Sequence, residues 1–562
     1  MKNSILSFLA ASCMLTLIFG QVQQGDEDPP AWKTLQEQTV PMPEPYGEKV
    51  RAQGAFLELS LNDAIRLALT NNLELEIENF NEELNQQRVI QTRGFYDPVF
   101  SFRFGWNSSE RPSTSVLDAG RGTPTNIAKS WFLATSLQQN VSGGGSVTLD
   151  FDNSRSTNNS AFTTIDPRFG SDFQLAFRQP LWRGFRDTQT ERQIQLYNLD
   201  TQLSDSQFQQ RVAEVVQQVQ TQYWELVFAV QSYEARRQSM ELAIVQFENN
   251  KIRARIGVLA PIEITSSRAE VASREQEMIQ SEVQIILAEN GLKRLLAPDP
   301  GAPLWSLGLI PTDEPRVNDM QVAVALDEAV RLALQRRPEL DQVRLNLESN
   351  DVDRKFLRRD GRPTVDLFAA VLSAGTAGRV LRDEFVDTDG DGIPDTSVGR
   401  VPATDSPFFG SFGNSLGQVF GFDFLTYSVG VDVQIPLRNR SNEAQLAHAG
   451  ISERQLQSRM KNLQQMIVVE VRNAFQTIQT QRKRLEAAQL ARRLSAEQLR
   501  GEDRRFQAGL STNFEVLRFQ RDLADAHVVE LRARIDLQQA VTALQKAMFT
   551  IVDESDIVVA RR

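Results

Sequence analysis

Two very long stretches of the chain repeat apolar side chains in steps of three and four. Residues 185–256 contain neither proline nor glycine, and residues 441–508 contain no proline and only Gly450 and Gly501. This spacing places the apolar positions on one face of an α-helix. At about 1.5 Å per residue, each helix would be a rod of about 100 Å. Because such a rod cannot bury its apolar face inside a compact domain, the pattern predicts long neighbouring helices that pair as coiled-coil walls.

Shorter stretches with the same periodicity supply the neighbours. They cover residues 57–94 and 322–359, which precede the two rods, and residues 263–296 and 515–549, which follow them. A break near Asn71 divides the first stretch into a short and a longer helix, and Ser60 or Asn62 could cap its start. For the helices alone, a solid spectrin-like bundle is the alternative to walls.

Strict alternation of apolar and polar residues marks the predicted strands. It occurs near residues 98–107, 130–141, 145–153 and 171–181 in the first half and over residues 427–435 in the second. Such runs suit a sheet with one apolar and one wet face, in a membrane barrel or a soluble sandwich. The apolar positions of the first half are rich in aromatic residues, and short and long polar connections alternate, which favours an outer-membrane barrel.

The chain is internally duplicated. Residues 61–98 align without a gap to residues 326–363 at an offset of 265, with 13 identities in 38 positions. Each copy is followed by predicted strands, a Pro-Leu pair (Gln179–Leu181 or Ile435–Leu437), a rod, a glycine turn and a returning helix. The predicted organisation is a signal peptide (1–20), a disordered extension (21–55), a first repeat (56–300), a linker (301–320), a second repeat (321–550) and a tail (551–562).

Composition narrows the class of protein. Residues 1–20 carry one lysine and a long apolar stretch, as a secretory signal peptide does, so the mature chain is expected to leave the cytosol. The only cysteine, Cys13, lies in this stretch and only faintly resembles a lipoprotein cleavage site, so no disulfide or thiolate metal site is expected. The net charge of −11 disfavours a nucleic-acid partner. The rest of the chain has no apolar run long enough for a membrane helix, so a bilayer could be crossed only by a closed barrel.

Together, these features resemble the TolC-like outer-membrane efflux family (outer membrane factors). The resemblance rests on the signal peptide, the duplicated helix, Gln-Pro-Leu closing the strands, and an Arg-x-x-x-Gly-x-x-x-x-x-Glu-[Ile/Val] turn in each half, and it covers about residues 56–550. It implies an α+β membrane protein, in which three identical chains share one transmembrane β-barrel and one periplasmic tunnel of coiled-coil helices, an α-barrel. Such a trimer is a passive exit duct in the outer membrane for efflux or type I secretion. A periplasmic adaptor docks at its helical tips, and an inner-membrane RND, MFS or ABC transporter supplies the energy.

The resemblance also assigns roles to residues of the two turns. The adaptor-contact tips would be Gly257, Val258, Leu259 and Ala260 in the first half and Gly509, Leu510, Ser511 and Thr512 in the second. Glu515 would lie at the pore constriction, where members of the family carry acidic rings. The next acidic position of the family is Arg518 here, and a Glu515–Arg518 pair could neutralise itself. A glutamate that simply stabilises the helix start is the alternative for Glu515.

One acidic loop stands apart from the family pattern. Asp387, Asp389, Asp391 and Asp395, with Gly392, copy the start of a calcium loop, which would lie on the extracellular side. Because Val398 replaces the final bidentate glutamate, a solvated acidic turn is the alternative to a Ca²⁺ site. No cofactor is otherwise expected.

Rival functions remain open from the sequence. A periplasmic coiled-coil scaffold or a surface adhesin without a pore would use the same rods. An enzyme is not expected, since no catalytic triad, metal cluster or phosphate loop stands out. The number of strands is also open, because the family pattern gives twelve in the trimer. All the segments found here would give eighteen, unless the hairpin at residues 143–145 projects above the barrel.

Overall fold

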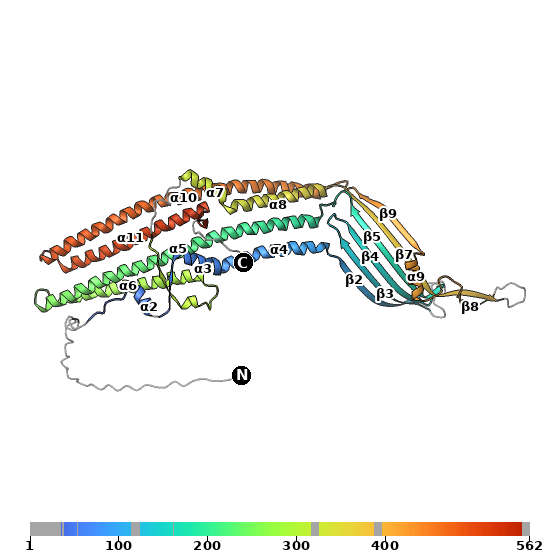
Figure 1. Ribbon diagram of the computed structural model, residues 1–562, viewed down its shortest axis with the longest axis horizontal. Helices are drawn as coiled ribbons and strands as arrows, with labels where there is room; N and C mark the ends of the chain where they lie inside the picture. Colours follow the sequence, from blue (N-terminus) through green and yellow to red (C-terminus); the bar gives the residue numbers. More distant parts are fainter. Residues whose placement is uncertain are drawn as a thin grey trace, which may run out of the picture.

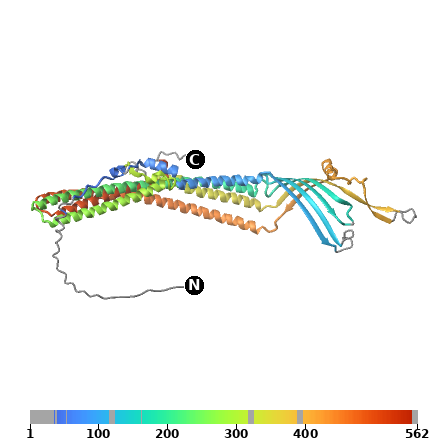
Figure 2. The same cartoon turned by 90° about the horizontal axis from the view of Figure 1, so that it is seen from below.

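The computed structural model is an elongated molecule, with helices along most of its length and a curved β-sheet at one end (Figure 1; Figure 2). It describes residues 35, 39–52, 54–113, 124–160, 162–315, 325–386 and 396–553. The predicted signal peptide lies outside these residues, as does the candidate calcium loop with Asp387, Asp389, Asp391 and Asp395.

The helices form two equivalent sets, as the duplication predicts. The first set is α3 (Leu61–Asn71), α4 (Leu73–Arg93), α5 (Gln189–Arg255) and α6 (Ile262–Leu296), and the second is α7 (Leu326–Arg336), α8 (Pro338–Asp360), α10 (Arg440–Gln507) and α11 (Asn513–Met548). The rods α5 and α10 have 67 and 68 residues, which confirms the two long helices. Ser60 caps α3 and Asn72 caps α4, so the break in the first stretch is real.

The helices lie side by side in one layer. In the half next to the sheet, the contacts follow the order α4–α5–α8–α10, and towards the free tips they follow the order α6–α5–α11–α10. The rods α5 and α10 therefore run through both halves of the layer. The shorter helices α4 and α8 lie beside them in the half next to the sheet, and α6 and α11 lie beside them towards the tips (Figure 1). This arrangement is a wall with two open edges rather than a closed bundle.

The sheet contains more strands than the family pattern predicts. Its antiparallel order is β2 (Val99–Pro112), β3 (Thr125–Asn140), β4 (Ser146–Asn158), β5 (Ile165–Pro180), β7 (Thr364–Val386) and β9 (Leu425–Gln434), and β8 (Thr396–Pro402) pairs with the outer end of β7. All four segments of the first half therefore lie side by side. The idea that residues 143–145 project above the sheet is wrong. That turn lies at the helical end, where the Arg186 amide donates to the Gly143 carbonyl at 3.4 Å.

The flanking segments differ from their predictions. Residues 46–52 of the predicted disordered extension form α2 (Tyr46–Ala52), because Tyr46 packs on the Tyr233 ring at 6.2 Å. The predicted first helix starts only at Leu61, since residues 56–59 form β1 (Phe56–Leu59), parallel to β6 (Gly308–Pro311). Strand β6 lies inside the predicted linker. Both strands gain their stability from burial, which the local pattern does not reveal.

The main core lies where α3, α5 and the β1–β6 pair meet. Val215, Val219 and Leu226 of α5 are fully buried there. The Tyr223 hydroxyl donates to the Asp313 carboxylate at 2.8 Å, and burial raises the pKa of this hydroxyl. A second core joins α7, α10 and α11. No helix in the described part of the chain is both long and apolar enough to cross a membrane.

Candidate functional site: helix tips, hairpin contacts and sheet faces

The two glycine turns have the same backbone geometry. Gly257 has a φ of +80° and Gly509 a φ of +74°, in the left-handed region that glycine adopts at low cost. In each turn the next amide reaches back to the last turn of the rod: Val258 N donates to Arg253 O at 2.9 Å, and Leu510 N donates to Arg505 O at 2.8 Å. These bonds are those of a Schellman cap, which satisfies the carbonyls at a helix end.

The tips present exposed apolar side chains. Val258 and Leu510 are 73% and 72% exposed, and Ile256, Ile262 and Phe514 beside them are also exposed. Of the other predicted tip residues, Ala260 is exposed and Leu259 is half-buried. The structure brings both tips to the same end of the molecule (Figure 1). Both tips therefore present exposed apolar side chains at the same end of the molecule.

Two of the predicted contact residues also hold the second tip together. The Ser511 hydroxyl donates to the Glu502 carboxylate, and the Thr512 side chain accepts from the Glu515 amide at 3.4 Å as the N-cap of α11. Their side chains thus stabilise the turn itself.

Glu515 and Arg518 form the ion pair that their spacing predicts. The Arg518 Nη2 atom lies 2.7 Å from Glu515 Oε2, and both side chains are partly exposed. The Arg518 guanidinium also lies over the Phe519 ring, 4.8 Å from its centroid. Within one chain, the carboxylate of the predicted constriction is therefore balanced by a neighbouring cation.

A buried polar network that the sequence did not reveal joins the two hairpins near their tips. Gln246 of α5 donates to the Asn513 side chain of α11 at 2.8 Å, and Asn250 donates to Ser267 of α6 at 2.6 Å. The Asn513 amide also donates to Ser267 at 3.4 Å. Asn250, Ser267 and Asn513 are at most 3% exposed. These polar positions interrupt the apolar stripes of their helices, and that interruption was the available signal.

Arg274 of α6 extends this connection further from the tip. Its side chain is 2% exposed, and its guanidinium donates to Glu270 Oε1 at 3.0 Å, to the Ser239 carbonyl at 2.9 Å and to the Leu517 carbonyl at 2.9 Å. Burial lowers the pKa of Arg274, although Glu270 opposes this shift. One side chain therefore bridges α6, α5 and α11 and resists separation of the two hairpins.

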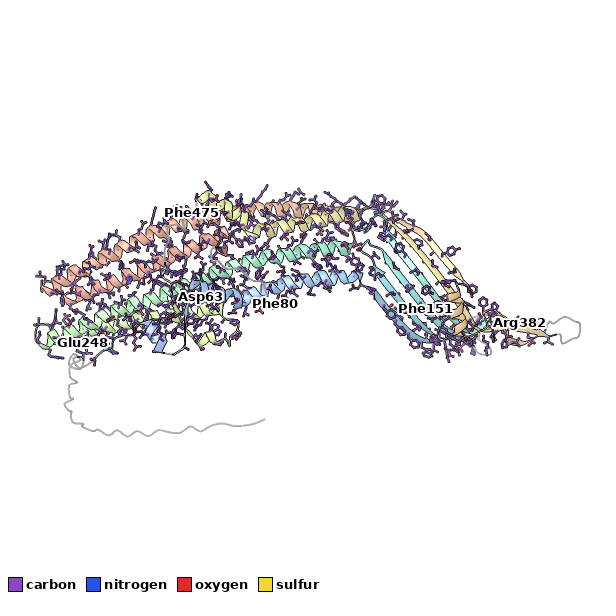
Figure 3. The ribbon with its side chains drawn as sticks, viewed as in Figure 1. Asp63, Phe80, Phe151, Glu248, Arg382 and Phe475 are labelled. Carbon is purple, nitrogen blue, oxygen red and sulfur yellow. The ribbon has the colours of Figure 1, made fainter. Side chains whose placement is uncertain are left out.

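The sheet has two chemically different faces, separated by the alternation of its strands. The apolar face comprises Phe100, Phe102, Phe104, Trp106, Leu133, Leu137, Leu149, Phe151, Phe173, Leu175, Leu367, Val371, Tyr427, Val429, Val431 and Val433. Many of these side chains are open to solvent in the single chain; Phe100 is 67% exposed and Tyr427 78%. In Figure 3, Phe151 lies within the sheet, while Arg382 lies beyond it towards β8. A water-soluble sheet would not leave such a face uncovered.

The polar face carries charged side chains on most of its strands. Its charged members include Arg103, Asp150, Asp152, Asp172, Arg178, Asp366 and Asp432. Arg178 Nη2 lies 2.7 Å from Asp366 Oδ2 and 3.9 Å from Asp432 Oδ2. Asp152 and Asp172 lie opposite each other on adjacent strands. This face is suited to contact with water.

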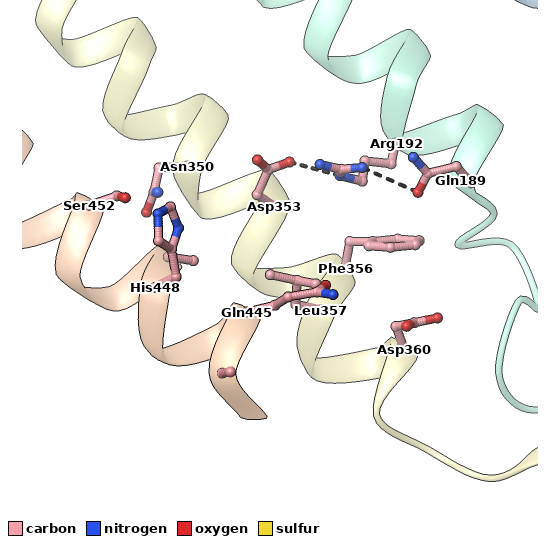
Figure 4. Close-up of a pocket in the computed structure, with 12 residues that line it drawn as sticks. Gln189, Arg192, Asn350, Asp353, Phe356, Leu357, Asp360, Gln445, His448 and Ser452 are labelled. Carbon is pink, nitrogen blue, oxygen red and sulfur yellow. Dashed lines mark hydrogen bonds and ion pairs between the residues drawn. The ribbon is translucent and has the colours of Figure 1, made fainter. Parts of the chain in front are cut away.

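A groove between helices lies where they meet the sheet (Figure 4). It has a volume of about 840 Å³ between α5, α8 and α10. The groove is lined by Asp353 and His448, among others, but Asp353 accepts its hydrogen bond from Arg192, at 2.8 Å. The Arg192 guanidinium also lies over the Phe356 ring, 5.2 Å from its centroid. The described residues contain no group of three or more His, Cys, Asp or Glu side chains that could hold a metal ion. The groove is a helix-packing feature, and it shows no catalytic arrangement.

Rods with paired tips and an amphipathic sheet define an elongated architecture with a helical and a β part. Residues 329–548 match the family model described as outer membrane efflux protein. This match covers the second repeat, and the predicted resemblance to the TolC-like efflux family is confirmed.

Solved structures share the fold over almost the whole chain. A membrane protein from Pseudomonas aeruginosa is 15% identical and matches with a TM-score of 0.59, covering 91% of this chain and 99% of that one. The CmeC outer membrane channel of Campylobacter jejuni, also 15% identical, has a TM-score of 0.58 and coverages of 88% and 89%. The outer membrane protein VceC of Vibrio cholerae is 15% identical, with a TM-score of 0.54 and coverages of 90% and 97%. At this identity the likeness concerns the fold. No curated protein sequence matches the chain.

Proposed function

We propose that this protein is the outer-membrane channel of a tripartite efflux or type I secretion system. Three copies would form a passive exit duct, with the sheets in the outer membrane and the helices in the periplasm. A periplasmic adaptor would bind at the tips, and an inner-membrane transporter would drive the cargo. The family match over residues 329–548 and the shared fold of outer membrane channels support this proposal. A duct of this kind performs no catalysis.

In the described part of the chain, both the sheet and the helical wall end in unpaired edges, and this observation carries the proposal. One edge of the sheet is β2. The other edge is β9, which pairs with the inner part of β7. Strand β2 leads away from the helices and β9 returns to them, so the β9 edge of one copy can pair with the β2 edge of the next in antiparallel register. Closure in this way would satisfy the free backbone groups of both edges.

The helical wall has matching unpaired edges. On α10, Ile451, Met466 and Val469 are each more than half exposed. At the opposite edge, Ile77 and Leu84 of α4 are similarly exposed, and apolar residues of α6 continue the stripe towards the tips. Contact between α10 of one copy and α4 and α6 of the next would bury these stripes. The same threefold arrangement of copies would therefore close both the helical wall and the sheet.

Three copies would give eighteen strands, six from each chain. Barrels of 16–18 strands leave an aqueous channel rather than a filled interior. The apolar face would then contact lipid, and the charged polar face would line the water-filled lumen. Six strands in each chain favour the wider, eighteen-stranded pore over the twelve-stranded one.

Cysteine cross-linking tests the assembly, since the mature chain is expected to carry no cysteine of its own. Phe102→Cys, combined in one chain with Val429→Cys or Val431→Cys, places both thiols on the apolar face of the two edges. Oxidation should give linked dimers and trimers on a denaturing gel. The matched control is Ser101→Cys with the same partners, whose thiol lies on the opposite face and should not link.

Conductance in a planar bilayer tests the channel itself. The purified protein should produce long-lived, water-filled pores. A protein that cross-links as a trimer but passes no ions would be a scaffold or adhesin, and the duct would be refuted. A monomer that neither links nor conducts would refute the assembly as well.

A further inference from the structure

A short helix lies on the apolar face of the sheet, where the proposed function places lipid. Helix α9 (Phe412–Gly421) packs on the middle of β7 and on the outer half of β5. Figure 2 shows it standing out from the strands, in orange. Its side of the sheet follows from its ring contacts: Phe420 lies 6.2 Å from Phe151, and Phe412 lies 6.4 Å from Trp131. Both partners belong to the side of the sheet that carries the apolar face.

The contact between α9 and β7 is close and specific. The Ser415 hydroxyl donates to the Gly375 carbonyl at 3.0 Å, and the Ser373 hydroxyl donates to the Val419 carbonyl at 2.7 Å. A Cβ atom at Gly375 would lie 2.1 Å from the Ser415 carbonyl oxygen. The absence of a side chain at Gly375 therefore allows the helix to lie directly on the strand.

This segment also covers an edge that β9 leaves open. Strand β9 pairs with β7 only as far as Ser373. Beyond this point, the Ala374 amide donates to the Phe424 carbonyl at 3.0 Å, and the Thr376 amide donates to the Gln418 side chain at 2.8 Å. On the face below, polar side chains such as Asn153 and Ser171 are at most 3% exposed. The helix thus replaces lipid over a part of the sheet that is too polar to face hydrocarbon.

The outer side of the segment is apolar and uncovered. Phe420, Phe422 and Phe424 are 64%, 55% and 45% exposed, and they continue directly into Leu425 and Tyr427 of the apolar face. The helix itself contains no charged residue. An aromatic row of this kind is typical of the boundary between hydrocarbon and headgroups.

The position of α9 along the strands agrees with that boundary. Strand β7 enters the apolar face at Val365, and its contacts with α9 run from Ser373 to the level of Ala377, eight to twelve residues later. Eight to twelve residues span roughly 26–40 Å along a strand, or roughly 20–30 Å along the membrane normal at a tilt of about 40°. In a hydrocarbon core of about 30 Å, this range lies in the outer leaflet, with the Phe412 end of α9 at its boundary. The level of α9 also carries Trp106 and Trp131, as an aromatic belt would.

We infer that α9 and Phe422–Phe424 form an interfacial membrane anchor on the outside of the barrel. Its aromatic row contacts the acyl chains of the outer leaflet. This inference rests on the proposed function, because it requires the apolar face to lie in a bilayer. The anchor fixes the depth of the sheet in the membrane and seals the outer half of β7 without a further strand.

Fluorescence quenching in lipid vesicles tests this anchor. Phe420→Cys, Tyr427→Cys and Ser428→Cys are each labelled with an environment-sensitive fluorophore, and the trimers are placed in vesicles whose lipids carry a spin label near the headgroup or deep in the acyl chain. Tyr427 lies midway along the apolar face, and Ser428 is its neighbour on the polar face. These two positions are matched controls for lipid and water.

We expect the label at position 420 to be quenched by the lipid spin labels, with a higher ratio of shallow to deep quenching than at 427, because Phe420 lies at the register level of Ser373, two residues beyond Val371, the partner of Tyr427. The label at 427 should be quenched more by the deep than by the shallow spin label, and the label at 428 should respond only to aqueous iodide. Quenching of the label at 420 by iodide alone, with 427 still quenched by lipid, would overturn the anchor and leave the channel intact. Absence of lipid quenching at 427 would refute membrane insertion, and with it both proposals.

Discussion

Arg274 offers the sharpest test of how the two helical hairpins are held together. In Arg274→Met, the side chain keeps most of its apolar length but loses the guanidinium and its hydrogen bonds to Glu270, Ser239 and Leu517. Breaking a buried ion pair costs about 3–5 kcal/mol. Glu270 retains 20% exposure and can turn towards water, so the lower end, about 3 kcal/mol, applies here.

Because Arg274 contacts three helices, this loss should appear as easier local separation of α11 from α5 and α6. Hydrogen exchange of the purified protein, followed by mass spectrometry of peptides around Leu517 and Ser239, measures it. A loss of about 3 kcal/mol corresponds to roughly a hundredfold faster exchange by local opening. The control is Arg331→Met, where an exposed ion pair with Glu328 is lost and exchange should change little.

A double-mutant cycle separates the ion pair from the other bonds. Glu270→Gln should cost less in the Arg274→Met background than in the wild-type protein, because its partner is already absent. Exchange within threefold of the wild type in Arg274→Met would show that the guanidinium does not hold the hairpins together, whatever the cycle gives.

Three further predictions concern the turns, the constriction and pH. Gly257→Ala should destabilise the first tip by about 1 kcal/mol, because Gly257 has a positive φ. Gly450→Ala should stabilise the protein by a similar amount, because Gly450 lies inside a helix with open space around it. Thermal unfolding of the two variants measures both effects. Glu515→Gln leaves Arg518 unpaired, so the reversal potential in a salt gradient should shift towards anion selectivity, and an unchanged potential would place this pair away from the pore. Burial lowers the pKa of His527 in the folded protein. The stability that this histidine contributes is therefore fully present above about pH 6.5 and should decline as the pH falls towards the folded-state pKa. His527→Gln should remove this part of the pH dependence of unfolding.

Much of the architecture was predictable because its signals are local. The steps of three and four in α5 and α10 and the alternation in the strands report which side of each element is buried. The glycine turns were also predictable, since Gly257 and Gly509 end long uninterrupted patterns. The Glu515–Arg518 pair followed from a spacing of three on one helix.

The interior of the candidate site was less predictable, because its partners are distant in the sequence. In the sequence, Arg274 cannot be distinguished from a surface arginine, because its partner Leu517 on α11 lies 243 positions away. The same holds for Asn513 and Gln246. Polar residues at helical positions indicate a solvated face unless a second helix is known to cover them.

The length of the rods, the duplication, the turns and the two-faced character of the strands could be predicted from the order of residues, because these signals depend only on local patterns. Other features became apparent only in the folded chain: six strands share one sheet, β1 pairs with β6, and α9 lies on the apolar face against Gly375. These features depend on which surfaces meet after the chain has folded, and backbone pairing between distant segments leaves little trace in the local pattern of either one.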